Sequence, residues 1–123
     1  MFCWKEENPE KLKDAIKTAL AAGYRHFDCA YVYENEQHIG QILRDCIAES
    51  NGALKREDLF ITSKCWNQFH SPEAVAEHLD SCLKKFGFDY LDLYLMHWPM
   101  GFKVIVIRFI FKCCKLSLIF WLF

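Results

Sequence analysis

Asp28, Tyr33, Lys64 and His97 supply a carboxyl, a phenol, an amine and an imidazole group, and each lies at or just beyond the end of a short apolar run. Side chains of these types can donate or accept protons in a reaction when a fold brings them together. Taken one at a time they have plainer explanations, such as a loop cap, a half-buried aromatic, a solvated strand end and a core histidine. Their placement on successive apolar runs instead favours a shared site.

The apolar runs are predicted to be β-strands that alternate with amphipathic helices. Asn8 suits a helix N-cap and Pro9 the first helical position, and Ser71 and Pro72 repeat this pattern. The predicted strands are Arg25–Ala30, Leu59–Lys64 and Leu91–His97, and the helices before or between them are predicted to end near Gly23, Ser50 and Gly87. Such alternation is typical of a parallel sheet, in which the loop after each strand emerges at the same edge. We therefore expect the four polar groups to meet at one rim of the sheet.

Three stretches carry a resemblance to a known family. They read GYRHFDCAYVYENEQHIG at Gly23–Gly40, FITSKCWN at Phe60–Asn67 and LYLMHWP at Leu93–Pro99, and in this order they are similar to motifs of the aldo-keto reductases. The resemblance runs from about Cys3 to Pro99, with Met1–Lys5 similar to the end of the family's first strand. It implies an α/β fold, the N-terminal half of a (β/α)₈ TIM barrel with about four parallel strands and three intervening helices.

The resemblance also implies a role for each polar residue in reducing an aldehyde or ketone to an alcohol. Tyr33 would donate a proton to the carbonyl oxygen, although a free phenol, with a pKa of about 10, is a sluggish acid at neutral pH. Lys64 would favour the phenolate, Asp28 would keep Lys64 charged, and His97 would orient the carbonyl group. The substrate pocket would include Trp4, Tyr33, Trp66, His97 and Trp98, although the tryptophans would equally suit an ordinary core.

The implied cofactor is NADPH, which would supply the hydride. Asp28, which contacts the nicotinamide ribose in the family, is the one cofactor contact with a counterpart in these 123 residues. The family's other contacts follow later strands, and the sequence contains no GxGxxG turn or GxxxxGK[ST] loop that would offer another nucleotide site. We therefore expect the 123-residue chain by itself to be inactive, and nothing in it separates NADP from NAD.

Composition excludes some other classes of protein. With 15 basic and 16 acidic residues the formal charge is −1, and the lack of a basic stripe argues against a nucleic-acid partner. Lys55 and Arg56 are interpreted as a solvated turn. The seven cysteines include no CxxC pair or zinc-ligand spacing, so we expect reduced thiols and no metal site. The N-terminus lacks the layout of a secretory signal, which makes the cytoplasm the expected compartment.

The sequence changes character after Pro99. Residues 102–123 contain no acid, glycine or proline, and no helical stripe or strand–helix alternation organises them. We expect two regions, namely residues 1–101 as the partial barrel and residues 102–123 as a hydrophobic tail outside the family pattern. Val104–Phe123 is long enough to span a bilayer, but Lys112 and Lys115 would lie near its middle at a cost of roughly 2.5 to 3.5 kcal/mol each.

Two interpretations of function thus remain open from the sequence. The first is an NADPH-dependent oxidoreductase of small carbonyl compounds. The second is a non-catalytic fragment that associates with membranes or with a partner through the tail. An incomplete barrel also leaves sheet edges open, and in either case those edges would allow self-association.

Overall fold

A computed structural model describes residue 1, residues 8–105 and residues 108–113 of the chain. Trp4 and most of the strand expected at Met1–Lys5 lie outside the described residues, as do parts of Val104–Phe123. Met1 itself lies beside the first described strand, where its carbonyl oxygen accepts a hydrogen bond of 2.8 Å from the backbone N–H of Asp28.

Three α-helices follow in the predicted order, and two of them begin at the predicted caps Asn8 and Ser71. They are α1 (Pro9–Ala21), α2 (Glu36–Glu49) and α3 (Pro72–Phe86). The side chain of Asn8 caps α1 by accepting from the backbone N–H of Glu10 at 3.0 Å, and Ser71 caps α3 in the same way from Ala74 at 3.2 Å. Gly87 follows α3 with a φ of 67°, which glycine adopts without strain. The predicted caps are confirmed.

Three short strands form a parallel sheet in the order β1 (His26–Asp28), β2 (Phe60–Cys65) and β3 (Leu93–Met96). Asp28 pairs with Thr62 on β2, and Lys64 pairs with Leu95 on β3. A helix separates each strand from the next, as a parallel crossover requires. The predicted α/β architecture is confirmed, with three parallel strands in the described part of the chain.

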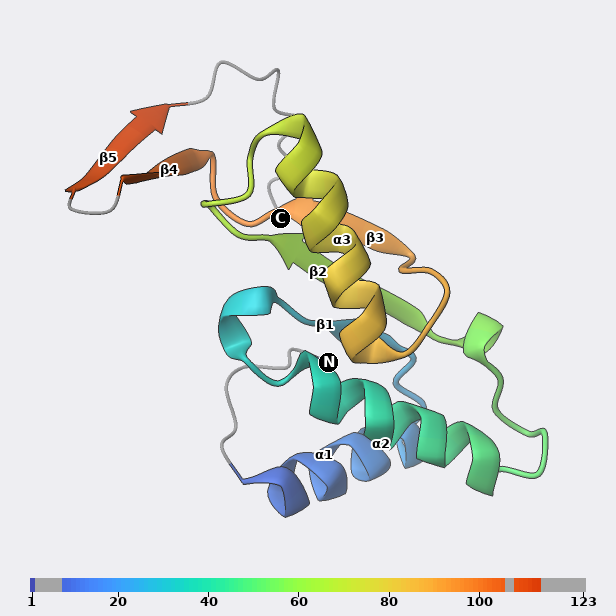
Figure 1. Ribbon diagram of the computed structural model, residues 1–123. Helices are drawn as coiled ribbons and strands as arrows, with labels where there is room; N and C mark the ends of the chain where they lie inside the picture. The colour runs from blue at the N-terminus through green and yellow to red at the C-terminus, as the bar shows by residue number, and fades with distance from the viewer. Residues whose placement is uncertain (2–7, 106–107, 114–123) are drawn as a thin grey trace.

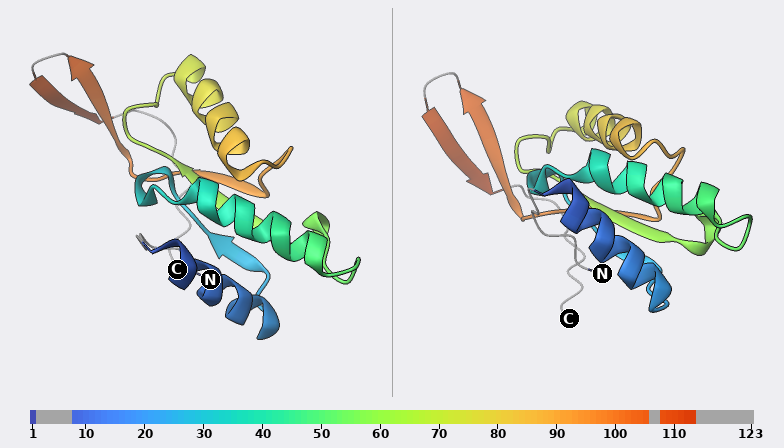
Figure 2. Two further views of the ribbon diagram at one scale, coloured as in Figure 1. Left: turned by 60° about the horizontal axis from the view of Figure 1, so that its bottom comes forward. Right: turned by 90° about the horizontal axis from the view of Figure 1, so that it is seen from below.

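The helices cover one face of this sheet (Figures 1 and 2). The hydrophobic core lies between the helices and the sheet. Successive strand residues point to opposite faces, so Phe27 and Ile61 enter the core while Asp28 and Lys64 lie on the other face. The core also contains Leu12, Ile16, Ile39, Leu43 and Phe86. The face opposite the helices leaves Phe60, Leu93 and Leu95 exposed.

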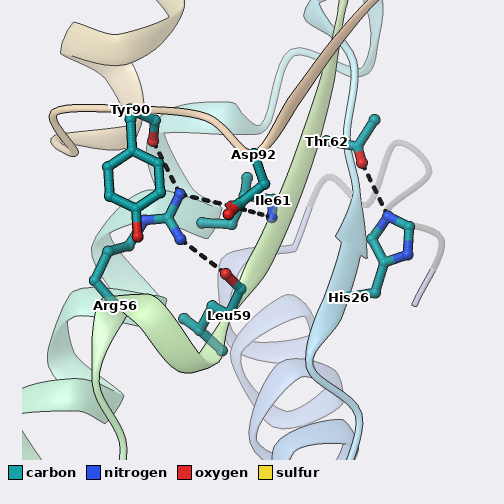
Figure 3. Close-up of polar contacts among 7 residues, drawn as sticks. All are labelled: His26, Arg56, Leu59, Ile61, Thr62, Tyr90 and Asp92. Carbon is teal, nitrogen blue, oxygen red and sulfur yellow. Dashed lines mark hydrogen bonds and ion pairs between the residues drawn. The ribbon is translucent and has the colours of Figure 1, made fainter.

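Arg56 ties the amino end of β2 to the segment before β3 (Figure 3). It begins a short 3₁₀ helix, Arg56–Asp58, and donates to the carbonyl oxygens of Leu59 and Tyr90, both at 2.9 Å. Its guanidinium pairs with Asp92 at 2.8 Å and lies over the ring of Tyr90, 3.9 Å from the centroid. The side chain is only 14% exposed, so the predicted solvated turn is wrong for Arg56. Its preceding neighbour Lys55 is exposed as predicted.

Residues 100–105 and 108–113 form a pair of strands, here called the hairpin, that the sequence pattern did not predict. Strands β4 (Met100–Ile105) and β5 (Arg108–Cys113) pair antiparallel in a separate sheet, which projects beyond the body of the molecule (Figure 1). Valine, isoleucine and phenylalanine are abundant here, and these residues favour strands. No helix in the described residues combines the length and apolar character that crossing a membrane requires.

Candidate active site

Asp28 and Lys64 form an ion pair at the carboxyl end of the parallel sheet. Asp28 is the last residue of β1, and Thr62 is its partner on β2, so Lys64 lies one pleat farther along the same face. The Lys64 ammonium contacts the Asp28 carboxylate and donates to the carbonyl oxygen of Cys29 at 2.7 Å. The Lys64 side chain is 13% exposed and the Asp28 side chain 38%. The ammonium group is therefore held by a charged and a neutral acceptor in a largely desolvated position.

Tyr33 reaches the same rim from the loop that follows β1. It is the last residue of a 3₁₀ helix, Tyr31–Tyr33, which begins after the extended residue Ala30 and ends at Glu34 in the left-handed conformation. The Tyr33 side chain is buried, at 4% exposure. The Lys64 ammonium lies 5.3 Å from the centroid of its ring. This tight turn thus brings the phenol ring beside the cation of β2.

His97 comes to the site directly after β3. Its backbone N–H donates to the carbonyl oxygen of Cys65 at 3.0 Å, which extends the pairing of β2 and β3 by one residue. Its ring meets that of Tyr33 edge to face, with centroids 5.9 Å apart at 89°. Burial lowers the pKa of His97 from its usual value, and the nearby Lys64 ammonium lowers it further while Asp28 opposes both. His97 is therefore a neutral imidazole near pH 7, able to donate one N–H hydrogen bond.

Two of the three predicted pocket tryptophans flank His97. Trp66 meets the imidazole at an interplanar angle of 75° with centroids 5.3 Å apart, and Trp98 stacks on it at 5.8 Å with a 4° angle. Phe102, at the start of the hairpin, lies edge to face with Trp66 at 6.1 Å. Trp4 lies outside the described residues. The structure thus places an aromatic wall beside the polar groups, and Phe102 is a member of it that sequence analysis missed.

The groups that hold the Lys64 side chain and its strand in place were not predicted from the sequence. The Cys29 carbonyl that binds Lys64 belongs to the backbone, for which no residue type is a signal. Glu36 is a buried carboxylate in the first turn of α2 that accepts a hydrogen bond of 2.6 Å from the Ser63 hydroxyl. Ser63 precedes Lys64 on β2 and points toward the helices. The Glu36 bond therefore fixes the strand that carries the lysine.

Taken together, the geometry suits transfer of a proton to an acceptor beside Tyr33. The Tyr33 ring lies 5.3 Å from the Lys64 ammonium group, which is itself paired with Asp28. The Nδ1 atom of His97 is buried with no hydrogen-bond partner in the part of the chain that the structure describes. Asp28, Tyr33, Lys64 and His97, chosen from the sequence, do meet at one rim.

Comparison with known proteins agrees with this geometry. A family model described as "Aldo/keto reductase family" matches residues 2–115. Proteins named aldo-keto reductase family 1 member A1 from Gallus gallus and Mus musculus are 52% and 53% identical to the chain over 100 residues. Each of these matches covers 81% of this chain and 30% of the relative, so the chain spans about a third of the length of the relatives it matches.

Solved structures match over the same region. The aldose reductase from Schistosoma japonicum superposes with a TM-score of 0.77 at 48% identity, covering 84% of this chain and 33% of that protein. The aldose reductase from Giardia lamblia gives a TM-score of 0.75 at 45% identity, with 83% and 33% covered. The three-stranded sheet and its helices thus correspond to part of an aldose reductase barrel.

Proposed function

The chain belongs to the aldo/keto reductase family, and from that premise we propose that it carries the proton-donating part of a site that reduces aldehydes or ketones to alcohols with NADPH. The observation that carries the proposal is the position of the Lys64 ammonium, paired with Asp28 and 5.3 Å from the ring centroid of the buried Tyr33. An isolated surface tyrosine would have no such neighbour. The residues of this chain then perform three tasks, which are proton donation, orientation of the carbonyl group and exclusion of water.

Proton donation falls to Tyr33. When the phenol gives its proton to the carbonyl oxygen, a negative charge remains on the tyrosine, and the Lys64 ammonium stabilises that charge. Asp28 and the Cys29 carbonyl hold the lysine ammonium in place, so little reorganisation is needed as charge develops. Burial of Tyr33 strengthens this interaction, because fewer water molecules screen it.

Orientation falls to His97. As a neutral imidazole it donates an N–H hydrogen bond to the carbonyl oxygen without competing with Tyr33 for the role of acid. Trp66 and Trp98 fix the ring from two sides and offer apolar surface to the body of the substrate. This arrangement favours aldehydes or ketones with hydrophobic substituents.

NADPH supplies the hydride when it is bound. The Asp28 side chain is 38% exposed and uses one oxygen for Lys64, which leaves the other available to a ribose hydroxyl. The residues present therefore fit the nicotinamide end of the cofactor. Among the described residues of this rim, Lys64 is already paired with Asp28 and is not free to bind the cofactor phosphates. We accordingly expect the 123-residue chain by itself to show negligible turnover. Its predicted compartment remains the cytoplasm.

A chimera tests the proposal. Residues 1–99 of this chain would replace the aligned segment of the Gallus gallus relative, with which the chain shares 52% identity over 100 residues. We expect the chimera to oxidise NADPH in the presence of an aldehyde. Tyr33→Phe should lower kcat by roughly 10²-fold or more, as loss of a general acid does, whereas Tyr24→Phe, at an exposed tyrosine outside the site, should not.

The outcome can also refute the proposal. A chimera with a native circular dichroism spectrum but no aldehyde-dependent NADPH oxidation would show that these residues do not support the reaction. Equal activity in the Tyr33→Phe and Tyr24→Phe chimeras would show that Tyr33 is not the proton donor.

A further inference from the structure

A cavity of about 430 Å³ lies between α2 and α3, away from the candidate active site. From α2 it is lined by His38, Gln41 and Arg44, and from α3 by Ser81, Lys84 and Lys85. Most of these side chains are exposed on the helical layer, whereas Asp28 and Lys64 lie on the opposite face of the sheet. Its volume falls in the range of pockets that bind small molecules.

The charge of this cavity differs from that of the chain as a whole. The sequence has a formal charge of −1, yet the lining contains Arg44, Lys84 and Lys85 and no acidic residue. Lys85 is compensated by the buried Glu36 at 3.4 Å. Within the described part of the chain, Arg44 and Lys84 form no ion pair, and the carboxylate of Asp45 accepts a hydrogen bond from Gln41. Two positive charges that form no ion pair in the described residues therefore face the cavity, one from each helix.

The close contact of the two helices fixes the position of Arg44. Gly40 lets α2 approach the last turn of α3, because a Cβ atom at this position would overlap the backbone of Phe86. The Arg44 guanidinium donates to the Phe86 carbonyl oxygen and, at 2.8 Å, to the side chain of Gln41. It also occupies the space that a Cβ of Gly87 would fill. A positive group that is held rigidly loses little freedom when an anion binds.

We propose that this cavity binds the phosphate group of a small anion. A phosphate offers three strong acceptor oxygens, and the cavity presents the donors that suit them: a guanidinium, an ammonium and the Ser81 hydroxyl. The volume exceeds what a bare phosphate needs, so a phosphate monoester also fits. The site is independent of carbonyl reduction, since no residue of the rim takes part in it.

The test measures binding of two probes to the full 123-residue chain by NMR titration. The probes are inorganic phosphate and phenyl phosphate, in buffers that contain no other multivalent anion. We expect saturable shifts of the Gln41 and Ser81 backbone amides, with a Kd on the order of 1 mM for at least one probe. Binding of both probes would identify a monoester as an acceptable ligand, and binding of inorganic phosphate alone would identify the free anion.

Two variants decide between a specific site and general attraction. Lys84→Gln removes one cavity-lining charge from an exposed position and should weaken binding by about five-fold. Lys55→Gln removes an equally exposed charge that does not line the cavity and should leave Kd unchanged. Circular dichroism verifies that both variants retain their helices.

Three results would overturn the proposal. They are the lack of any saturable shift with either probe, an unchanged Kd in Lys84→Gln, and equal weakening in the two variants. The last result would mean that phosphate binding depends only on the net charge of the protein.

Discussion

Replacing Arg56 by methionine should lower the free energy of unfolding far more than the same change at Lys55. Arg56 donates to the carbonyl oxygens of Leu59 and Tyr90 and pairs with Asp92, which also accepts a hydrogen bond of 2.8 Å from the backbone N–H of Ile61 (Figure 3). Methionine keeps most of the apolar stem but removes every donor. Two carbonyl oxygens and one carboxylate then lose a partner at the same time.

The size of the effect follows from the burial of the pair. Removing one member of a fully buried ion pair costs about 3–5 kcal/mol, and an exposed pair contributes roughly 0–1 kcal/mol. The Arg56 side chain is 14% exposed and that of Asp92 is 20%, so water reaches the carboxylate in part. Asp92 also keeps its bond from Ile61. We therefore expect Arg56→Met to cost about 2–3 kcal/mol.

Urea unfolding followed by circular dichroism measures the difference. Lys55→Met is the matched control, because the Lys55 side chain is 63% exposed and its ammonium lies 3.8 Å from the Glu57 carboxylate. It should cost less than about 0.5 kcal/mol. Arg56→Lys keeps the charge but loses the planar fork that reaches two carbonyl oxygens and the Asp92 carboxylate, and its cost should fall between those of the two methionine variants.

Equal losses at Arg56 and Lys55 would refute the reasoning, since charge alone would then explain both. A double-mutant cycle of Arg56→Met with Asp92→Asn gives a second check. We expect a coupling energy of at least about 1 kcal/mol. A cycle that closes to zero would show that the pair seen in the structure adds nothing to stability.

Two further predictions concern stability. Burial lowers the pKa of His78 to about 4, so between pH 6.5 and 4 the unfolded chain binds a proton that the folded chain excludes. The free energy of unfolding should therefore fall by up to about 3 kcal/mol on acidification. Urea midpoints measured across this range should show the fall, and a smaller one in His78→Gln. Gly40→Ala should destabilise the chain by about 1–3 kcal/mol despite the better helix propensity of alanine, because its Cβ overlaps Phe86, and an unchanged melting temperature would contradict this packing.

The local elements were predictable because their signals are local. Asn8 and Ser71 cap helices through bonds to backbone groups two or three residues away, and Gly87 ends α3 through its own conformation. The hairpin β4–β5 was not predicted, because its sequence shows no alternation of polar and apolar residues and no helix separates its strands. Strand propensity alone then decides, and it is a weak guide.

The site was predictable in part. Asp28, Tyr33, Lys64 and His97 were identified from motif and order, and parallel topology placed them at one rim. The supporting groups were not identified. Neither the Cys29 carbonyl nor the pairing of Glu36 with Ser63 follows from residue type, because both depend on how α2 lies against β2.

The sequence by itself therefore determined which residues could do chemistry and on which edge of a sheet they would gather. Local signals set the order of the strands and helices along the chain, and this order makes the strands parallel, with their carboxyl ends at one edge. Only the tertiary structure decided that Arg56 is largely shielded and bonded to distant segments while Lys55 is solvated. It also decided that Arg44 and Lys84 face one cavity. Such differences depend on contacts between segments distant in the chain, where burial and charge compensation are set by packing.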